Sequence, residues 1–409
     1  MENTKNGISP TTLFRGNTNI WVCVIIFEIM SIIFNISTSI RVSDSSGYIL
    51  KQTFFIIISF IAILFFQYVK IPLIRKFTRV LWIFSILMVG LMLVFGDSVN
   101  SSVRSWLGVN WFDVLRITFL LYMSRIFAQK ITEINSSFKN CLRYALLPAI
   151  ITWILPFREN LSTTICMVIL YFALLFISEI KIKYKFYICL ICLIGSALIL
   201  GLYFNGVSLT KRGQTGENRI TVWWNEVAHD IPNNNNQTIG SKTAIKTGGI
   251  FGTGLGHSQQ KYMSQADTDF AFSIFVEECG AVGAIALLII YGWLFLFALK
   301  IINKTEDKFS LYTCYSLILM ILVQSFLHIF VNVGLAPNTG QPLPIISRGG
   351  SALIINSIAL GIIINLSAKT KPSETMKAPR TKTQDTKEKK DEENYIDDNN
   401  VKKILSELE

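Results

Sequence analysis

The sequence predicts an all-α polytopic membrane protein with about ten transmembrane helices. Three observations support this fold class: 51% of the 409 residues are hydrophobic, the mean hydropathy is +0.46, and long apolar runs recur along the chain. A soluble domain of this length is much less apolar. The apolar runs therefore have to be covered by lipid and by one another.

A helix needs about 20 mostly apolar residues to cross the hydrocarbon core of a bilayer. Seven runs fall within residues 21–204, at 21–39, 54–69, 80–95, 114–127, 142–155, 162–177 and 186–204. Three more fall within residues 270–367, at 270–302, 311–333 and 344–367. No small-residue cleavage site follows the first run, so we expect it to be retained as a helix after an N-terminal segment, residues 1–20.

Basic residues predict the orientation, because Lys and Arg are retained on the cytoplasmic side of short loops. They gather in the even-numbered connections, as Lys70, Arg75, Lys76 and Arg79, then Arg125, Lys130, Lys139 and Arg143, then Lys181, Lys183 and Lys185, then Lys300, Lys304 and Lys308. Both termini are then cytoplasmic, and a large extracytoplasmic loop, residues 205–269, joins the seventh and eighth helices. The polar tail, residues 368–409, is expected to be disordered and cytoplasmic.

Charge and cysteine content exclude two other classes of function. Acidic and basic residues balance in the tail, so the net charge of +11 belongs to the membrane part, and no nucleic acid is implied. The seven cysteines lie in or beside apolar runs. We therefore expect neither a disulfide framework nor a zinc site.

The extracytoplasmic loop ends in a glycine-rich stretch between Gly248 and Gly256. Its five glycines leave backbone N–H groups able to approach an anion closely. The alternative is a flexible surface loop with incidental glycines. Ser258, Gln259 and Lys261 follow the stretch and add polar groups to it.

Asp269 stands where this loop meets the eighth apolar run. It is either a helix N-cap or a functional carboxylate. The helix terminus favours its charged form and burial disfavours it, so the sequence leaves the direction of its pKa shift open. In a helix Glu277 is about 12 Å further along the axis, which is too far for a paired-carboxylate glycosidase, whose groups are about 5 to 9.5 Å apart. A single base assisted by cations is the better prediction.

Arg348 enters the last apolar run after a stretch of prolines and glycines that includes Pro337, Gly340 and Pro344. Irregular backbone at membrane depth is tolerated only where protein or a water-filled cavity satisfies it. Arg348 needs a negative partner, and an anionic ligand and an acid from another helix are equally compatible with the sequence.

Four motifs in this order resemble the SEDS family of peptidoglycan glycosyltransferases, the FtsW and RodA type. The family's Gly-Gly-Leu-Phe-Gly-x-Gly-Leu-Gly-x-Ser-x-Gln-Lys loop is matched by residues 248–261, with Ile250 for the leucine. Its His-Thr-Asp-Phe box is matched by residues 267–270, with Asp267 for the histidine. Glu-Glu-x-Gly is matched by residues 277–280, and Pro-x-Thr-Gly-x-Pro-Leu-Pro with Ser-x-Gly-Gly-Ser by residues 337–344 and 347–351. The Ser-Arg-Gly-Gly form resembles the FtsW branch more than RodA.

One family box is altered in this chain. Where the family has Gln-Pro-Ser-Glu-x-x-Lys on the fourth helix, this sequence offers Asp113 and Arg116 at the acid and base positions. Residues three apart share a helix face, so an ion pair is expected there.

The resemblance implies an enzyme that polymerises lipid II into glycan strands during septal wall synthesis in cell division. Asp269 matches the family's catalytic aspartate and would act as general base. The resemblance and the residue types together suggest a substrate-binding set, namely Trp106, Arg219, Lys246, Ser258, Gln259, Lys261, Glu277, Ser347 and Arg348. Its cations, or a divalent cation such as Mg or Mn, would offset charge on the departing diphosphate; the metal is otherwise unknown.

The resemblance also implies surroundings and partners. It predicts a multi-pass protein of the bacterial plasma (inner) membrane with its active site on the outer face, a class B penicillin-binding protein as transpeptidase partner, and contacts with the division machinery. Two rival functions are a lipid II flippase, which would need polar groups at the midplane, and a non-catalytic division scaffold. Glu28 apart, the acids of the apolar runs lie near an outer end, which favours surface chemistry.

Overall fold

The computed structural model describes residues 14–40, 45–96, 105–157, 159–204, 219, 221–226, 228, 236–263 and 265–369. Within those ranges the chain is helical apart from turns and one isolated bridge between Trp106 and Val109. The all-α prediction is confirmed. The first two residues of the predicted disordered tail, residues 368–409, belong to the last helix, and the rest of the tail lies outside the described residues, as does most of the first half of the extracytoplasmic loop.

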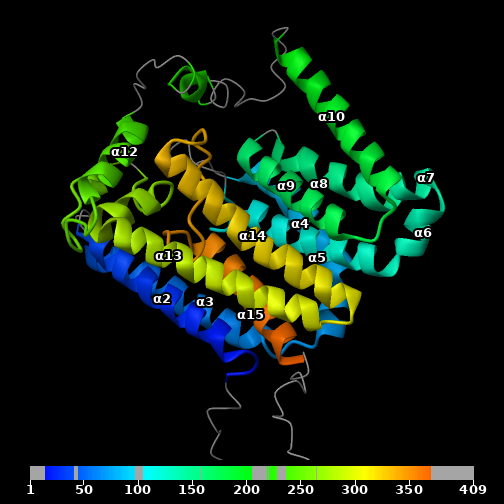
Figure 1. The fold of residues 1–409 in the computed structure, drawn as a ribbon, viewed down its shortest axis with the longest axis horizontal. Coiled ribbons are helices and arrows are strands. Elements are labelled where there is room, and N and C mark those ends of the chain that lie inside the picture. Colours follow the sequence, from blue (N-terminus) through cyan, green and yellow to red (C-terminus); the bar gives the residue numbers. More distant parts are fainter. Residues whose placement is uncertain are drawn as a thin grey trace, which may run out of the picture. The chain divides into compact units, whose positions relative to one another are not determined.

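Figure 1 shows the order of the helices along the chain. Those of the first part of the chain are α2 (Thr18–Ser39), α3 (Ser45–Phe66), α4 (Ile71–Phe95), α5 (Trp111–Gln129), α6 (Ile131–Ser136), α7 (Phe138–Cys141), a π-helical turn at Leu142–Leu146, α8 (Leu147–Phe157), α9 (Leu161–Ile177) and α10 (Ile182–Phe204). After them come α12 (Asn236–Gly248), a 3₁₀ turn at Gln260–Tyr262, α13 (Ala271–Lys304), α14 (Lys308–Val333) and α15 (Gly350–Lys369).

Seven helical stretches among the described residues are long and apolar enough to cross a membrane. They are Thr18–Ser39, Ser46–Phe66, Ile71–Phe95, Phe138–Phe157, Ala271–Lys304, Lys308–Val333 and Gly350–Ala368. Helices α5, α9 and α10 lie where the fourth, sixth and seventh spans were expected. Helix α9 is the shortest of these three. The polytopic prediction is confirmed, while the count of ten stays a prediction.

Several helix boundaries differ from the sequence expectation. Helix α3 begins at Ser45, nine residues before the apolar run at 54–69. Helix α4 begins at Ile71, nine residues before the apolar run at 80–95, with Pro72 in its first turn; proline favours that position because its missing N–H would be unpaired there anyway. The last helix begins at Gly350, not at residue 344. The intervening backbone is irregular and is satisfied internally, since the Pro344 carbonyl accepts a 2.7 Å bond from the Tyr291 hydroxyl.

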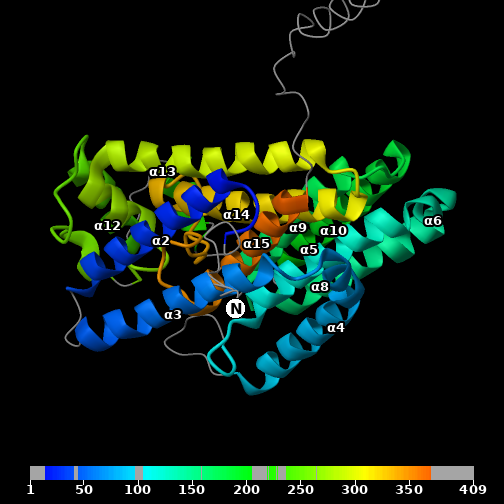
Figure 2. The ribbon, with the colours of Figure 1, turned by 90° about the horizontal axis from the view of Figure 1, so that it is seen from below.

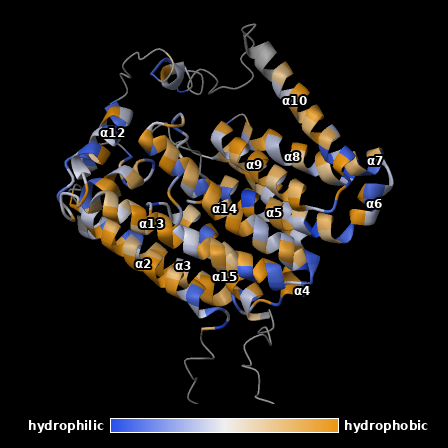
Figure 3. Cartoon of the chain, in the orientation of Figure 1, coloured by the Kyte–Doolittle hydropathy of each residue, from blue (hydrophilic) through white to orange (hydrophobic). Residues whose placement is uncertain are grey.

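The helices pack side by side, with α15 against α3, α4 against α5, and α14 between α5 and α13. Helix α12 lies at one end of the group and α6 at the other in both ribbon views (Figures 1 and 2). Hydrophilic residues gather around α12 at one end and around α6 and α7 at the other (Figure 3). Large apolar side chains such as Ile29, Phe84 and Ile285 are exposed on the outer helix faces. That pattern suits a lipid belt between two aqueous faces.

Candidate active site

Asp269 lies in a turn that leads into α13, at the α12 end of the molecule. The carbonyl of Gln265 accepts the backbone N–H groups of Thr268, Asp269 and Phe270 at 3.2, 3.0 and 3.3 Å. The N-cap position of α13 is held by Phe270, and no side chain caps it from that position. The N-cap alternative for Asp269 is therefore wrong, and its carboxyl group is left for another role.

Helix α14 supplies the cap that α13 lacks. His328 Nε2 accepts the Phe272 N–H at 3.2 Å, and Asn332 Oδ1 accepts the Ser273 N–H at 3.0 Å. His328 Nδ1 lies 2.7 Å from the Gln341 carbonyl, so Nδ1 carries the proton and the ring is neutral. Asn332 Nδ2 donates to the Asp269 carbonyl at 3.1 Å. These bonds fix the start of α13 relative to α14.

His328 was missed as a positioning residue by sequence reasoning. A signal was present, because histidine is rare inside a membrane span and usually serves a purpose there. It also precedes Asn332 by four residues, which places both on one helix face.

The Asp269 carboxyl group is partly buried, and burial raises its pKa from 3.8 to about 6. The positive charge of Arg219 and a hydrogen bond from Thr268 act in the opposite direction, and the negative charge of Asp267 adds to the increase. The effect of burial is the largest, so the pKa of Asp269 is raised, a direction that the sequence left open. Asp269 Oδ2 would lie 3.5 Å from a Cβ at Gly340, so the loop before α15 closes over it.

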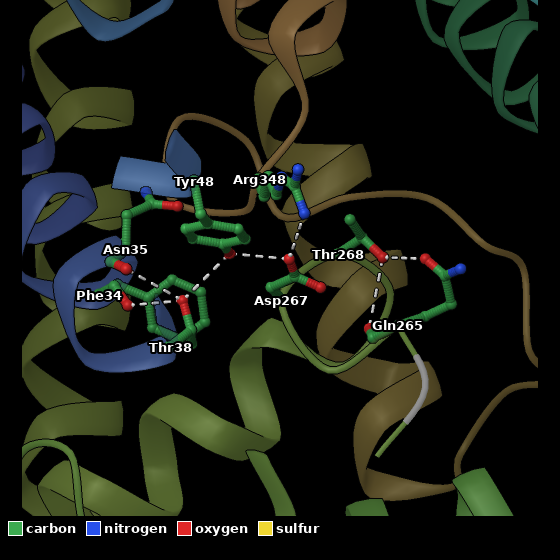
Figure 4. Close-up of polar contacts among 8 residues, drawn as sticks. All are labelled: Phe34, Asn35, Thr38, Tyr48, Gln265, Asp267, Thr268 and Arg348. Carbon is green, nitrogen blue, oxygen red and sulfur yellow. Dashed lines mark hydrogen bonds and ion pairs between the residues drawn. The ribbon is translucent and has the colours of Figure 1, made fainter. Parts of the chain in front are cut away.

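Arg348 has an acidic partner within the protein. Its Nη1 lies 3.2 Å from Asp267 Oδ2, and its guanidinium carbon lies 4.3 Å from the centre of the Tyr48 ring (Figure 4). The Tyr48 hydroxyl donates to the same carboxylate oxygen at 2.8 Å. About a third of the Arg348 side chain stays exposed, whereas that of Asp267 is buried. Arg348 is thus anchored at one edge and still accessible to an anion.

The glycine-rich stretch is neither a free anion nest nor a flexible loop. It pairs by backbone hydrogen bonds with a break in α13 at Gly280, where φ is +68°. A Cβ at Gly248, Gly252 or Gly280 would lie 2.1 to 2.2 Å from a carbonyl oxygen of the opposing segment. No other residue fits such an approach, so these three glycines are needed for packing.

The N–H groups that follow this stretch bind carboxylates of the protein itself. Glu277 is fully buried and accepts the Gln259 and Gln260 N–H groups at 3.1 and 3.2 Å, together with the Ser258 hydroxyl. Glu278 accepts the Gly256 N–H at 3.1 Å and the Ser37 hydroxyl. The anions held here are internal side chains.

Six of the nine predicted substrate-binding residues fall into two groups. Arg219, Ser347 and Arg348 surround the Asp269 segment, whereas Ser258, Gln259 and Glu277 form the glycine-loop cluster. Lys246 is exposed in the last turn of α12, and the side chain of Lys261 lies outside the described residues. Trp106 is partly buried beside α5, where its carbonyl accepts the Trp111 indole N–H at 3.2 Å. Contact of these residues with substrate stays a prediction.

The altered fourth-helix box forms the expected ion pair. Arg116 Nη2 lies 3.2 Å from Asp113 Oδ1, and both side chains are buried. Arg116 Nη1 also reaches the Gln341 side chain at 3.4 Å, and Gln341 donates to Thr163 at 3.0 Å. The pair therefore supports the loop whose carbonyl binds His328.

The described residues do not fit a metal held by the protein alone. No group of three or more His, Cys, Asp or Glu side chains comes together in that part of the chain. Near Asp269, the Asp267 carboxylate is already bound to Tyr48 and Arg348.

Comparison with known proteins gives one consistent family. The family model of FtsW, RodA and SpoVE, described as cell cycle protein, matches residues 17–372. The probable peptidoglycan glycosyltransferase FtsW of Buchnera aphidicola subsp. Baizongia pistaciae is 31% identical, covering 77% of this chain and 83% of its own. The stage V sporulation protein E of Bacillus subtilis is 28% identical, covering 80% and 88%.

Solved structures share the fold at low sequence identity. A chain from a structure described as a peptidoglycan synthase complex that coordinates polymerization and crosslinking matches with a TM-score of 0.66, 17% identity and coverage of 87% of this chain and 98% of its own. The rod shape determining protein RodA of Thermus thermophilus matches with a TM-score of 0.61, 18% identity and coverage of 87% and 98%. By its sequence, and with a fold to match, this chain belongs to the FtsW, RodA and SpoVE family.

Proposed function

We propose that this protein is a peptidoglycan glycosyltransferase that polymerises lipid II during septal wall synthesis, with Asp269 as the general base. The observation that carries the proposal is a partly buried carboxyl group whose pKa is raised to about 6 beside the cation of Arg219. A base is most effective when its pKa lies near the working pH. Relatives named as probable peptidoglycan glycosyltransferases support the same reaction.

The proposed step moves one proton and exchanges one bond. A sugar hydroxyl of one lipid II molecule attacks the anomeric carbon of a second, and Asp269 accepts the hydroxyl proton. The bond between the anomeric carbon and the diphosphate oxygen breaks, and polyprenyl diphosphate leaves with the electron pair. Arg219 and the exposed part of Arg348 are suited to offset the negative charge that develops on this leaving group.

A divalent cation enters this proposal only as a companion of the substrate. Mg²⁺ commonly binds substrate phosphates and uses one or two protein carboxylates. Since the described residues offer no three-ligand cluster, we derive no step through the metal. We predict that polymerase activity requires Mg²⁺ or Mn²⁺. Titrating the activity with a chelator tests this requirement.

We place the site on the outer face of the bacterial plasma membrane, with both termini in the cytoplasm. Asp269 is tied to α14 at Asn332, whose carbonyl accepts the Ser241 hydroxyl of α12. The opposite end of the molecule, where α6 lies, holds the basic residues Lys181 and Lys308 near Glu179. That distribution supports the positive-inside orientation. A class B penicillin-binding protein and the division machinery are the proposed partners.

A flippase has one observation in its favour. Glu28 is buried in the middle of α2 and accepts the Ser59 hydroxyl at 3.1 Å, and its second oxygen finds no partner among the described residues. A fluorescent lipid II translocation assay in vesicles separates the two functions. A flippase should lose translocation in Glu28→Gln and keep it in Asp269→Asn.

The decisive experiment is polymerisation of purified lipid II by the detergent-solubilised protein, with and without a partner transpeptidase. We expect Asp269→Ala and Asp269→Asn to abolish the glycan product ladder while the proteins remain monodisperse. Glu306→Gln is the matched control, since Glu306 is an exposed acid in the connection between α13 and α14. An unchanged ladder from Asp269→Asn rules out the proposed base.

A further inference from the structure

Three consecutive carbonyl groups around Asp269 are each held by a donor from another part of the chain. The Arg348 N–H donates to the Asp267 carbonyl at 2.9 Å, the Ser347 hydroxyl to the Thr268 carbonyl at 3.1 Å, and Asn332 Nδ2 to the Asp269 carbonyl at 3.1 Å. The segment is therefore fixed by α14 and by the loop before α15. The position of the carboxyl group of Asp269 depends on these two elements.

The side chain of Asp267 closes a triangle with Tyr48 of α3 and Arg348 (Figure 4). One carboxylate oxygen of Asp267 accepts from both residues, and the guanidinium group of Arg348 stacks on the Tyr48 ring. Charge-assisted hydrogen bonds are stronger than neutral ones, and a stacked cation adds to them where water is excluded. Thr38 of α2 lies 3.4 Å from the Tyr48 hydroxyl, so a fourth element supports the triangle.

We propose that Tyr48, Asp267 and Arg348 form a positioning unit that fixes the carboxyl group of Asp269. The inference rests on the proposed function, since it assumes that Asp269 is the general base. None of the three needs to touch the reacting sugar hydroxyl. Asp267 is the residue that departs from the family's His-Thr-Asp-Phe box, so this pairing is a property of the present sequence.

The charges of Asp267 and Arg348 have opposite effects on the pKa of Asp269. Among the described residues, the charge of Arg219 lowers the pKa of Asp269 and the charge of Asp267 raises it. Arg348 offsets the charge of Asp267, and His328, on the facing helix α14, is neutral in this hydrogen-bonding arrangement. Removing the Asp267 charge therefore lowers the pKa of Asp269, whereas removing the Arg348 charge raises it.

The test is the pH profile of lipid II polymerisation for Asp267→Asn, Arg348→Gln, the double variant and Arg348→Lys. We expect kcat to fall by roughly ten- to a hundredfold in the single variants, as for a base displaced by about 1 Å. The acidic limb of the pH–rate profile, where Asp269 becomes protonated, should move to lower pH in Asp267→Asn and to higher pH in Arg348→Gln. The double variant should bring the limb back toward the wild-type position, and Arg348→Lys should restore the limb with only part of kcat.

A purely structural role gives a different result. It lowers the amount of monodisperse protein in both single variants and leaves the acidic limb of the remaining activity unchanged, which overturns the inference. A loss confined to KM also overturns it, because it shows that Arg348 acts only by binding substrate. If Asp269→Asn itself retains polymerase activity, the proposed function is wrong. If Asp269→Asn is inactive and the acidic limb of the pH–rate profile does not move in the other variants, only the proposal of a positioning unit is wrong.

Discussion

Replacing Asp269 by Asn should make the protein inactive and, above neutral pH, more stable. The reason is that burial raises the pKa of this carboxyl group, so the folded protein holds its charged form at a cost. A rise from 3.8 to about 6 corresponds to roughly 3 kcal/mol, at about 1.36 kcal/mol for each pH unit. Because the side chain is partly exposed, we expect a gain of about 1 to 3 kcal/mol at pH 8.

The sign of the effect follows from linkage. For a group whose folded pKa is raised, stability is fully present below the unfolded pKa of 3.8 and is lost as the pH rises through about 6. Asp269→Asn removes that loss, so its advantage should grow between about pH 4 and pH 6 and then stay constant up to pH 8. Thermal unfolding of the detergent-solubilised proteins across this range measures it, with Glu306→Gln as the control. A variant that is less stable at pH 8, or a gain that does not change with pH, contradicts the reasoning.

Three further predictions concern the surrounding structure. Gly252→Ala should cost more than about 3 kcal/mol of stability because its Cβ would meet the Glu278 carbonyl at 2.1 Å, whereas Gly249→Ala, also at positive φ but with open space around it, should cost about 1 kcal/mol in a thermal melt. Glu277→Gln should speed hydrogen exchange at the Gln259 and Gln260 amides, while equal exchange in both proteins would contradict a protective role for the hydrogen bonds from these amides to Glu277. Asp307→Ala should destabilise α14 by about 1 kcal/mol through loss of its N-cap, and Asp307→Asn, which can still cap, should cost less.

The pattern of apolar runs predicted the helices well, because a bilayer imposes both their length and their composition. The boundaries were less well predicted where polar residues continue a helix. Helix α4 extends to Ile71 through Arg75, Lys76 and Arg79, which an apolar window counts as a connection. The break in α13 at Gly280 also escaped detection, since a glycine inside an apolar run looks like an ordinary helical residue.

The sequence indicated candidate functional residues by their position and by family motifs, but it did not indicate their partners within the protein. Nothing in the sequence separates an internal acid from a ligand as the counterpart of Arg348. Tyr48 lies 219 residues from Asp267, and only the packing of α3 brings them together. The direction of the Asp269 pKa shift likewise depends on how deeply the turn is buried, which periodicity does not report.

The occupied amides of the glycine-rich loop have a consequence for inhibitor design. Backbone N–H groups at a glycine-rich loop are a common binding site for a diphosphate. Here the Gln259, Gln260 and Gly256 amides already bind Glu277 and Glu278, so such a compound would have to displace two internal carboxylates. A competitive inhibitor should instead present its anionic group to guanidinium side chains near Asp269, and selectivity can be sought in the contacts around Tyr48.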